Sequence, residues 1–198
     1  NYSDVNTAGG TYASWTFRKA PKFFDVVTYT GNGVAGREIA HSLGSVPGMV
    51  IVKNLSVSSD WAVWNRGLTS GNYIVLNSSA GQTSSYAGYV FGNNGTTIDP
   101  TSTHFTVGSG YFVNASGNTY VAYVFAHDAG GFGDDGQQNV ISCGSVSGQQ
   151  TINLGWEPQW LLMKRTDSAG DWRLVDAMRG LTAVNSNDAW LAPNTNAA

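Results

Sequence analysis

Charged residues are scarce in this chain of 198 residues. Asp, Glu, Lys and Arg together make up 12% of it, about half of the roughly 25% that is usual in globular domains. Only 10 residues are Lys or Arg, and the net charge is −3. Because nucleic-acid binding depends on a concentrated basic face, the composition argues against a nucleic-acid partner.

Cysteine and long apolar runs are also nearly absent. The single Cys143 cannot form an internal disulfide, so a disulfide framework does not stabilise this fold. No apolar run approaches the roughly 20 residues that a membrane span requires. We therefore expect no membrane span.

Residues that could form a catalytic centre are few. The three histidines, His41, His104 and His127, lie far apart in the sequence and outside any metal-spaced motif. Residues 144–148 have the spacing of a nucleophile elbow but carry Val146 where the serine should stand. The paired carboxylates of a glycosidase are not evident either. We therefore expect a protein without enzymatic activity.

Glycine and aromatic residues are abundant instead. The chain has 25 Gly, 7 Trp and 9 Tyr, a composition typical of short strands joined by tight turns. Such surfaces also contact sugars or other proteins through hydroxyls, amides and rings. No window shows a sustained helical period. These features predict an all-β fold, specifically an antiparallel β-sandwich.

Two parts of the chain, residues 27–68 and 140–181, carry the same ordered set of landmarks. In both, a Leu-Gly pair, a proline, a lysine, an Asp-Trp pair and an Arg-Gly-Leu sequence follow in the same order. The two tryptophans, Trp61 and Trp172, are 172 − 61 = 111 residues apart. Such an ordered recurrence indicates an internal repeat, with tandem units of about 110 residues.

A second similarity sets the boundaries of the units. Residues 6–17 match residues 114–125 at an offset of 125 − 17 = 108, and this segment precedes each copy. We therefore predict three parts. Residues 1–22 are the closing strand of a preceding repeat plus a linker, and residues 23–135 are a complete sandwich unit. Residues 136–198 are the first part of a second unit. The chain is then either a piece of a longer tandem array or a permuted domain whose terminal pieces complete each other.

Several strands can be placed from alternation and from short apolar runs. Residues 49–53 form an apolar run that ends in Lys53, which indicates a strand covered on both faces. Further strands are expected over residues 10–17, 23–30, 60–64, 73–76, 86–91, 119–125 and 160–164, with a hairpin between 104–107 and 111–113.

Aromatic residues that occur in only one copy are the better candidates for ligand binding, because repetition signals the fold. These residues are Trp64, Tyr86, Tyr89 and Trp190. A ring beside a carboxylate suits a sugar, since the ring stacks on C–H groups while the carboxylate accepts hydrogen bonds from hydroxyls. Asp60, next to Trp61, is therefore also a glycan-binding candidate. A repeated Asp-Trp pair equally suits a structural core in which the Asp caps a turn.

Three carboxylates, Asp128, Asp134 and Asp135, lie in a glycine-rich loop between the predicted units. Loops of this kind can bind Ca²⁺ through oxygen ligands, but the EF-hand order of ligands is missing. A flexible linker is the favoured interpretation, and a calcium site is the alternative. No other cofactor is expected.

The repeated pattern resembles a known kind of domain. It comprises Leu43-Gly44, Pro47, the apolar strand ending in Lys53, Trp61 and the closing segment 119–125. Together these resemble domains found in tandem in large virion proteins of marine tailed bacteriophages, such as tail fibres. The resemblance implies a concanavalin-like or jelly-roll sandwich at the virion surface or outside the cell. It also implies a homo-oligomer whose partners are neighbouring repeats or subunits and host surface polysaccharide.

The resulting expectation is a non-enzymatic appendage module that displays or performs binding to host surface glycans. One alternative is a purely structural spacer or capsid decoration, and another is a bacterial surface adhesin or extracellular filament subunit. A receptor binder should expose Trp64, Tyr86 and Tyr89 on loops at one end of the sandwich. A filament subunit should leave an open sheet edge that an adjacent copy fills by strand addition.

Overall fold

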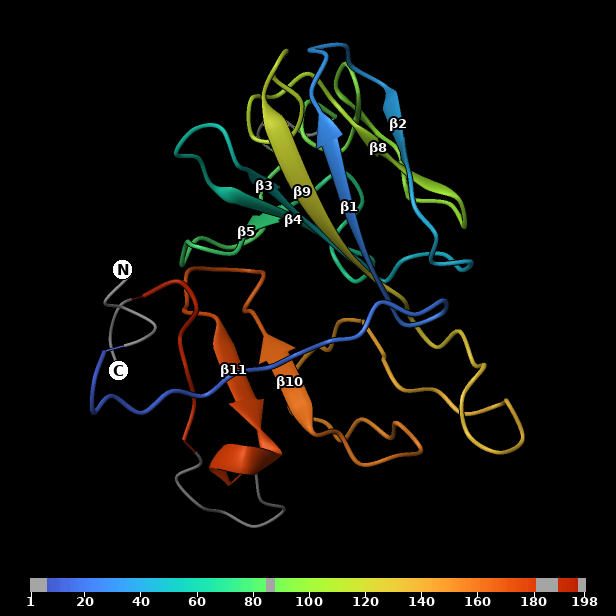
Figure 1. Ribbon diagram of the computed structural model, residues 1–198, viewed down its shortest axis with the longest axis vertical. Coiled ribbons are helices and arrows are strands. Elements are labelled where there is room, and N and C mark those ends of the chain that lie inside the picture. Colours follow the sequence, from blue (N-terminus) through green and yellow to red (C-terminus); the bar gives the residue numbers. More distant parts are fainter. Residues whose placement is uncertain (1–6, 85–87, 181–188, 196–198) are drawn as a thin grey trace.

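Figure 1 shows the computed structural model of the chain, which describes residues 7–84, 88–180 and 189–195. Within these ranges the regular elements are β-strands and one 3-10 turn, Ala177–Arg179. All named strand pairs are antiparallel. The predicted all-β, antiparallel class is therefore confirmed. No helix in the described part of the chain has the length and apolar character to cross a membrane.

The main sheet has five strands in the order β1-β9-β3-β4-β5. Their bounds are Phe24–Thr30 for β1, Met49–Asn54 for β3, Trp61–Asn65 for β4, Ile74–Val75 for β5 and Thr119–Phe125 for β9. Strand β9 lies between β1 and β3, although more than half of the unit separates it from them in sequence. It pairs Phe125 with both Phe24 and Met49, so the late segment 119–125 holds the early strands together.

Strand β3 is the most deeply buried strand. Its first four residues are exposed by at most 8%, because both faces of the sheet are covered. Val50 and Val52 belong to one core cluster, and Met49 and Ile51 to another on the opposite face. The prediction of a strand covered on both faces is confirmed.

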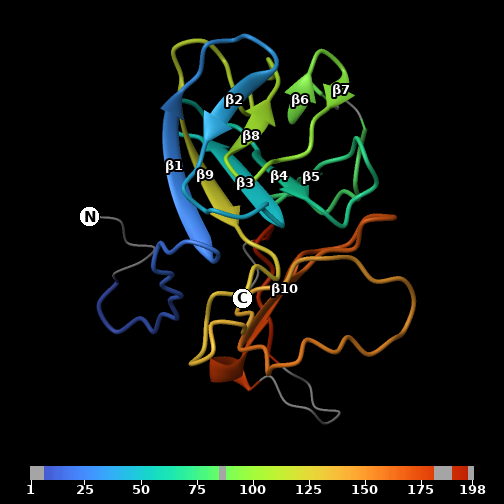
Figure 2. The same cartoon turned by 90° about the vertical axis from the view of Figure 1, so that its right-hand side faces the viewer.

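A two-stranded ribbon covers one face of the main sheet. Strand β2, Arg37–Ala40, pairs with β8, His104–Val107, and their apolar residues Ile39 and Phe105 share a core cluster with Val50 of the main sheet. The ribbon lies to the right of the main sheet in Figure 1, and in front of it in Figure 2, which is viewed from that side.

A small hairpin lies next to this ribbon in the chain. Strands β6, Gly92–Asn93, and β7, Thr96–Thr97, form it, and both turn residues, Asn94 and Gly95, have positive φ. Asn-Gly is the favoured sequence for such a two-residue turn, since both positions must tolerate that backbone conformation. The strand expected over 86–91 is wrong for the described residues 88–91, which form turns and bends before this hairpin.

The hairpin predicted between 104–107 and 111–113 is also wrong. Strand β8 pairs with β2 instead, and residues 111–113 form a turn. The turn is closed by its own backbone bonds, from Val113 N and Asn114 N to Gly110 O at 3.0 and 2.8 Å. The buried Asn114 amide then donates to Val34 O and Gly108 O at 2.9 Å each, which fixes the loop without a strand.

The second copy of the sequence pattern forms a hairpin of its own. Strand β10, Trp160–Met163, pairs with β11, Arg173–Asp176. Trp172 packs against the main sheet, where its indole Nε1 donates to Val75 O at 2.9 Å. The hairpin is therefore docked on the outer face of the main sheet, below it in Figure 1.

The N-terminal strand predicted over 10–17 does not form. Residues 11–19 have no regular structure and cross the β10–β11 hairpin in Figure 1. The side chain of Trp15 donates from Nε1 to Asp176 at 3.0 Å. The alternating pattern is present, but the segment crosses the hairpin instead of running along the edge of a strand, so no ladder forms.

Candidate binding groove

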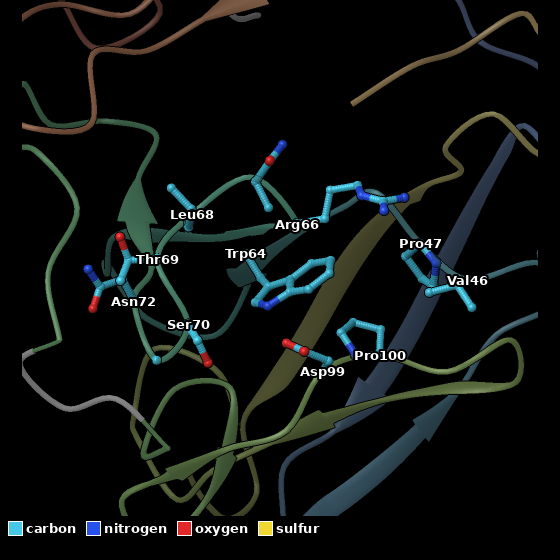
Figure 3. Close-up of a pocket in the computed structure, with 12 residues that line it drawn as sticks. Val46, Pro47, Trp64, Arg66, Leu68, Thr69, Ser70, Asn72, Asp99 and Pro100 are labelled. Atoms are coloured by element: carbon cyan, nitrogen blue, oxygen red, sulfur yellow. The ribbon is translucent and has the colours of Figure 1, made fainter. Parts of the chain in front are cut away.

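A groove of about 500 Å³ lies where β4 ends, a volume within the usual range for small-ligand sites. Its walls come from the end of β4, the loop between β4 and β5, the turn before β3 and the segment before β8. Residues that line it include Trp64, Arg66, Thr69, Asn72, Asp99 and Pro100. Figure 3 shows the Trp64 ring between Arg66 on one side and Asp99 with Pro100 on the other.

Trp64 forms the aromatic floor of this groove. It pairs with Val50 in the β3–β4 ladder and lies in the core cluster that the ribbon covers. Only 6% of its surface is exposed, because alternation along β4 turns it toward the core. Within the described residues, the indole Nε1 has no hydrogen-bond partner, nor is it among the fully buried atoms that lack one.

The loop that forms one wall is held by polar contacts. Asn65 Oδ1 accepts from Gly67 N at 2.8 Å. Gln82 anchors Thr69 twice, accepting from its backbone N at 2.9 Å and donating to its hydroxyl at 3.0 Å. A side chain at Gly67 would lie 2.6 Å from the backbone carbon of Gly144, so the loop can approach that segment only with glycine there. These contacts preorganise the wall.

Two opposite charges line the groove. Arg66 and Asp99 are both exposed, and within the described residues neither forms an ion pair. Their donors and acceptors are therefore available to a bound molecule. Burial, together with the nearby Arg66 charge, holds the pKa of His127 below its usual value. His127 is thus neutral at physiological pH and adds no charge to this end of the sheet.

Of the predicted glycan-binding residues that the structure describes, one lines the groove. Trp64 lines it, but as a buried strand residue, so the expectation of an exposed loop aromatic is wrong for this residue. Tyr89 is 44% exposed and does not line the groove. Tyr86 lies outside the described residues. Trp190 is 42% exposed, with the Arg173 guanidinium 4.4 Å from its ring centre.

Asp60 also lies away from the groove, where it takes part in a local clamp. Its Oδ1 accepts from Asn77 Nδ2 at 2.9 Å, and Asn77 Oδ1 accepts from Trp61 N at 2.9 Å. These bonds tie the start of β4 to the end of β5. Asp60 thus has a structural contact, which it makes with a side-chain amide and not by capping a turn.

Two of the three loop carboxylates considered as calcium ligands, Asp128 and Asp135, contact separate partners. Asp128 accepts from the Ser142 hydroxyl at 3.1 Å and lies 3.4 Å from His127 Nδ1. Asp135 accepts from Gln137 N at 2.9 Å. Within the described residues, no three acidic, histidine or cysteine side chains come close enough to hold a metal ion. The structure therefore does not gather these carboxylates into a site.

Sequence reasoning missed Arg66 and Asp99. Arg66 belongs to the repeated Arg-Gly-Leu sequence, and repetition pointed to the fold and not to a binding site. Asp99 is 99 − 64 = 35 residues from Trp64, and only the pairing of β8 with β2 brings it near. Its one sequence signal is the Asp-Pro pair that precedes β8, a common turn sequence with no functional meaning of its own.

Comparisons with known proteins place the chain in a family without giving it a function. Neither the curated proteins nor the solved structures searched contained a match. The resemblance to phage appendage domains therefore stays a prediction. A family model does match the chain, over residues 1–198. On that match, the chain belongs to the family described as a domain of unknown function, DUF7483.

Proposed function

We propose that this chain is a non-enzymatic binding module that takes a surface glycan in the Trp64 groove. The observation that carries the proposal is the combination of an indole floor with the unpaired charges of Arg66 and Asp99 in one groove. Sugars present C–H faces and hydroxyls together, and a ring beside charged hydrogen-bonding groups matches both. Charge-assisted hydrogen bonds are roughly twice as strong as neutral ones, so this pair would dominate the polar contacts.

The remaining lining supports the same class of ligand. Thr69, Ser70 and Asn72 supply hydroxyl and amide groups, and Pro47 and Pro100 supply apolar walls. Because the charges of Arg66 and Asp99 are opposite, the groove has little net charge. A neutral or zwitterionic polysaccharide suits it better than a highly charged one.

We infer that the setting is a virion appendage built from tandem two-layer sandwich units, with the chain at the particle surface. Two observations support such units. The β2–β8 ribbon and the main sheet share one core. The clamp at Asp60 also recurs in the second copy, where Asn194 donates to Asp171 at 2.8 Å and accepts from Trp172 N at 2.8 Å.

The test is direct binding to a panel of bacterial surface polysaccharides, measured by tryptophan fluorescence. We expect saturable binding, weakened about 10-fold or more in Asp99→Asn and in Arg66→Gln, since each change removes a charged hydrogen bond. Asp134→Asn, which alters an exposed carboxylate outside the groove, is the matched control and should bind normally. Binding that survives both groove changes, or no binding to any polysaccharide, contradicts the proposal.

A structural spacer is the second candidate, and the docked second hairpin favours it. Trp172 is only 3% exposed at this contact. The loop that precedes it, between β10 and β11, donates from Gly170 N to Ser79 O and accepts at Thr166 O from Gln82 N, both at 2.8 Å. Contacts of this kind would stack successive units in an array. Concentration-dependent assembly on a sizing column, together with no glycan binding, would favour the spacer.

A further inference from the structure

We propose that the unpaired edge of β10 accepts residues 11–17 of the same chain as an added strand, which completes the second unit. The inference concerns a different surface from the groove and does not depend on glycan binding. It rests on the equivalence of the two copies, on an apolar edge left open, and on an N-terminal segment that already touches one end of that edge.

Strand β10 occupies in the second copy the place that β3 has in the first. Trp160 and Met49 are 160 − 49 = 111 residues apart, the same offset as the Asp-Trp landmarks. Strand β3 pairs with β4 on one edge and with β9 on the other. Strand β10 pairs with β11 in a sheet of two strands, so the edge that corresponds to the β9 side is open within the described residues.

The face of β10 that corresponds to the ribbon-covered face of β3 leaves apolar side chains in solvent. Leu161 and Met163 are 37% and 42% exposed, whereas their counterparts Val50 and Val52 are fully buried. An exposed apolar strand edge is a template for another strand, since its backbone donors and acceptors are unpaired. Strand addition uses these groups for affinity and the alternate side chains for specificity.

The N-terminal segment has the sequence of the missing strand. It matches β9 at an offset of 108, which places Phe17 at the position of Phe125 and Trp15 at that of Tyr123. In the first unit Phe125 lies opposite Met49. By the same register, Phe17 should lie opposite Trp160 and Trp15 opposite Leu162. These four side chains would then share one face of the sheet.

One end of the segment is already at this position. The rings of Phe17 and Trp160 meet edge to face with centroids 5.8 Å apart. Beyond that point the segment departs from β10, because Trp15 Nε1 donates to Asp176 at 3.0 Å, and Asp176 is the residue of β11 that pairs with Trp160. The segment therefore crosses the hairpin. A rotation about Phe17 would lay residues 11–16 along β10.

The occupant is this chain's own segment because its C-terminal end is held in place. Phe17 also contacts Phe24 and Phe125 of the main sheet, with centroids 5.7 and 6.3 Å apart. A strand tethered at one end has a high effective concentration at the edge, which favours it over the same strand from a second copy.

An engineered disulfide between Ser14→Cys and Met163→Cys tests this register, in a Cys143→Ser background. The corresponding pair in the first unit is Ala122 and Val52. Leu55 N donates to Thr119 O, and ladder alternation then makes Ala122 and Val52 a non-hydrogen-bonded pair with closely spaced Cα atoms. That spacing suits a disulfide.

In the structure, the N-terminal segment crosses the hairpin at the end where Trp160 pairs with Asp176, and Trp15 contacts that end. Ser14 is the neighbour of Trp15 in the chain. Met163 lies at the other end, opposite Arg173. The matched control is Ser14→Cys with Leu162→Cys, one residue out of register, where the side chain points to the opposite face. We expect an intramolecular disulfide in the first variant, seen as a faster monomer band on a non-reducing gel, and little in the control.

Three results would overturn the proposal. A disulfide-linked dimer would mean that a second copy occupies the edge of β10. The absence of a crosslink would mean that residues 11–17 do not pair with β10. Equal crosslinking of the control would mean that the predicted register is wrong. Hydrogen exchange on the unmodified chain provides a measurement that needs no substitution. Amides of residues 11–17 should exchange slowly together with those of β10, and fast exchange across 11–17 would count against the added strand.

Discussion

The side chain of Asn77 joins Asp60 to the start of β4. Its Nδ2 donates to the Asp60 carboxylate at 2.9 Å, and its Oδ1 accepts from the backbone N of Trp61 at 2.9 Å. In the second copy Asn194 makes the same two bonds, at 2.8 Å each, with Asp171 and the amide that follows it. A side-chain amide suits this position because it donates and accepts at once.

Replacing Asn77 by alanine should lower the free energy of unfolding by about 2 kcal/mol, since two hydrogen bonds of roughly 1 kcal/mol each are lost. Urea unfolding followed by intrinsic fluorescence measures the change. Ser102→Ala, at an exposed position, is the control and should leave the midpoint unchanged. An unchanged midpoint in Asn77→Ala would mean that the clamp does not stabilise the sheet.

Asp25 should make the free energy of unfolding depend on pH in the acidic range. It is 1% exposed and accepts from Lys19 Nζ at 2.6 Å and from Ser42 N at 2.6 Å. Burial alone would raise the pKa of this carboxyl, but the bonds from Lys19 and from the Ser42 and Val26 amides lower it below its usual value. The ionised form is therefore favoured by folding, and its stabilisation is fully present above the unfolded pKa of about 3.9.

As the pH falls from about 4 through the lowered folded pKa, that stabilisation should be lost. Asp25→Asn should be about 2 kcal/mol less stable at neutral pH and should show a smaller loss between neutral and strongly acidic pH. The measurement is urea unfolding at a series of pH values. If the free energies of unfolding of the two proteins change in parallel with pH, Asp25 is not the source of the acid dependence.

Cys143 should be unreactive in the folded protein. Burial, with a smaller contribution from the Asp128 charge, raises the pKa of its thiol to about 12. Only the thiolate is nucleophilic, so alkylation by iodoacetamide at about pH 8 should be on the order of 100-fold slower than in urea. Equal rates in the folded and unfolded chain would show that the thiol is accessible and ionised.

Trp172 should control the attachment of the second hairpin. Trp172→Ala removes a buried ring and its bond to Val75 O, at a cost of about 3 kcal/mol. Hydrogen exchange should speed up across 160–176 while β9 stays protected. The control Tyr89→Ala affects an exposed ring outside this cluster and should leave 160–176 unaffected. Unchanged protection in Trp172→Ala would contradict this contact.

Strands with a strong local signal could be predicted from the sequence. Strand β3 begins at Met49 and ends within one residue of its expected bounds, and β9 matches its expected range of 119–125. In these segments β-branched and aromatic residues, bounded by turns, leave little choice of structure. The fold class followed from the same features.

Pairings and sites that depend on distant residues could not be predicted. The alternation before and after Gly108 suggested a hairpin, but β8 pairs with β2 because the loop closes on itself around Asn114. Trp64 stood out as an aromatic that one copy lacks. Arg66 and Asp99 did not, because no local pattern reveals which charges lack a partner once the chain has folded.

The measurement that tests the groove most directly is an NMR titration of the indole N–H signals with a polysaccharide that binds. The chain has seven tryptophans, and a Trp64→Phe variant assigns the signal of Trp64. A ligand in the groove should shift the Trp64 signal most, in proportion to saturation, with little change at the distant Trp190. A titration in which Trp64 stays fixed while Trp190 or another indole moves would place the binding surface elsewhere and contradict the proposed site.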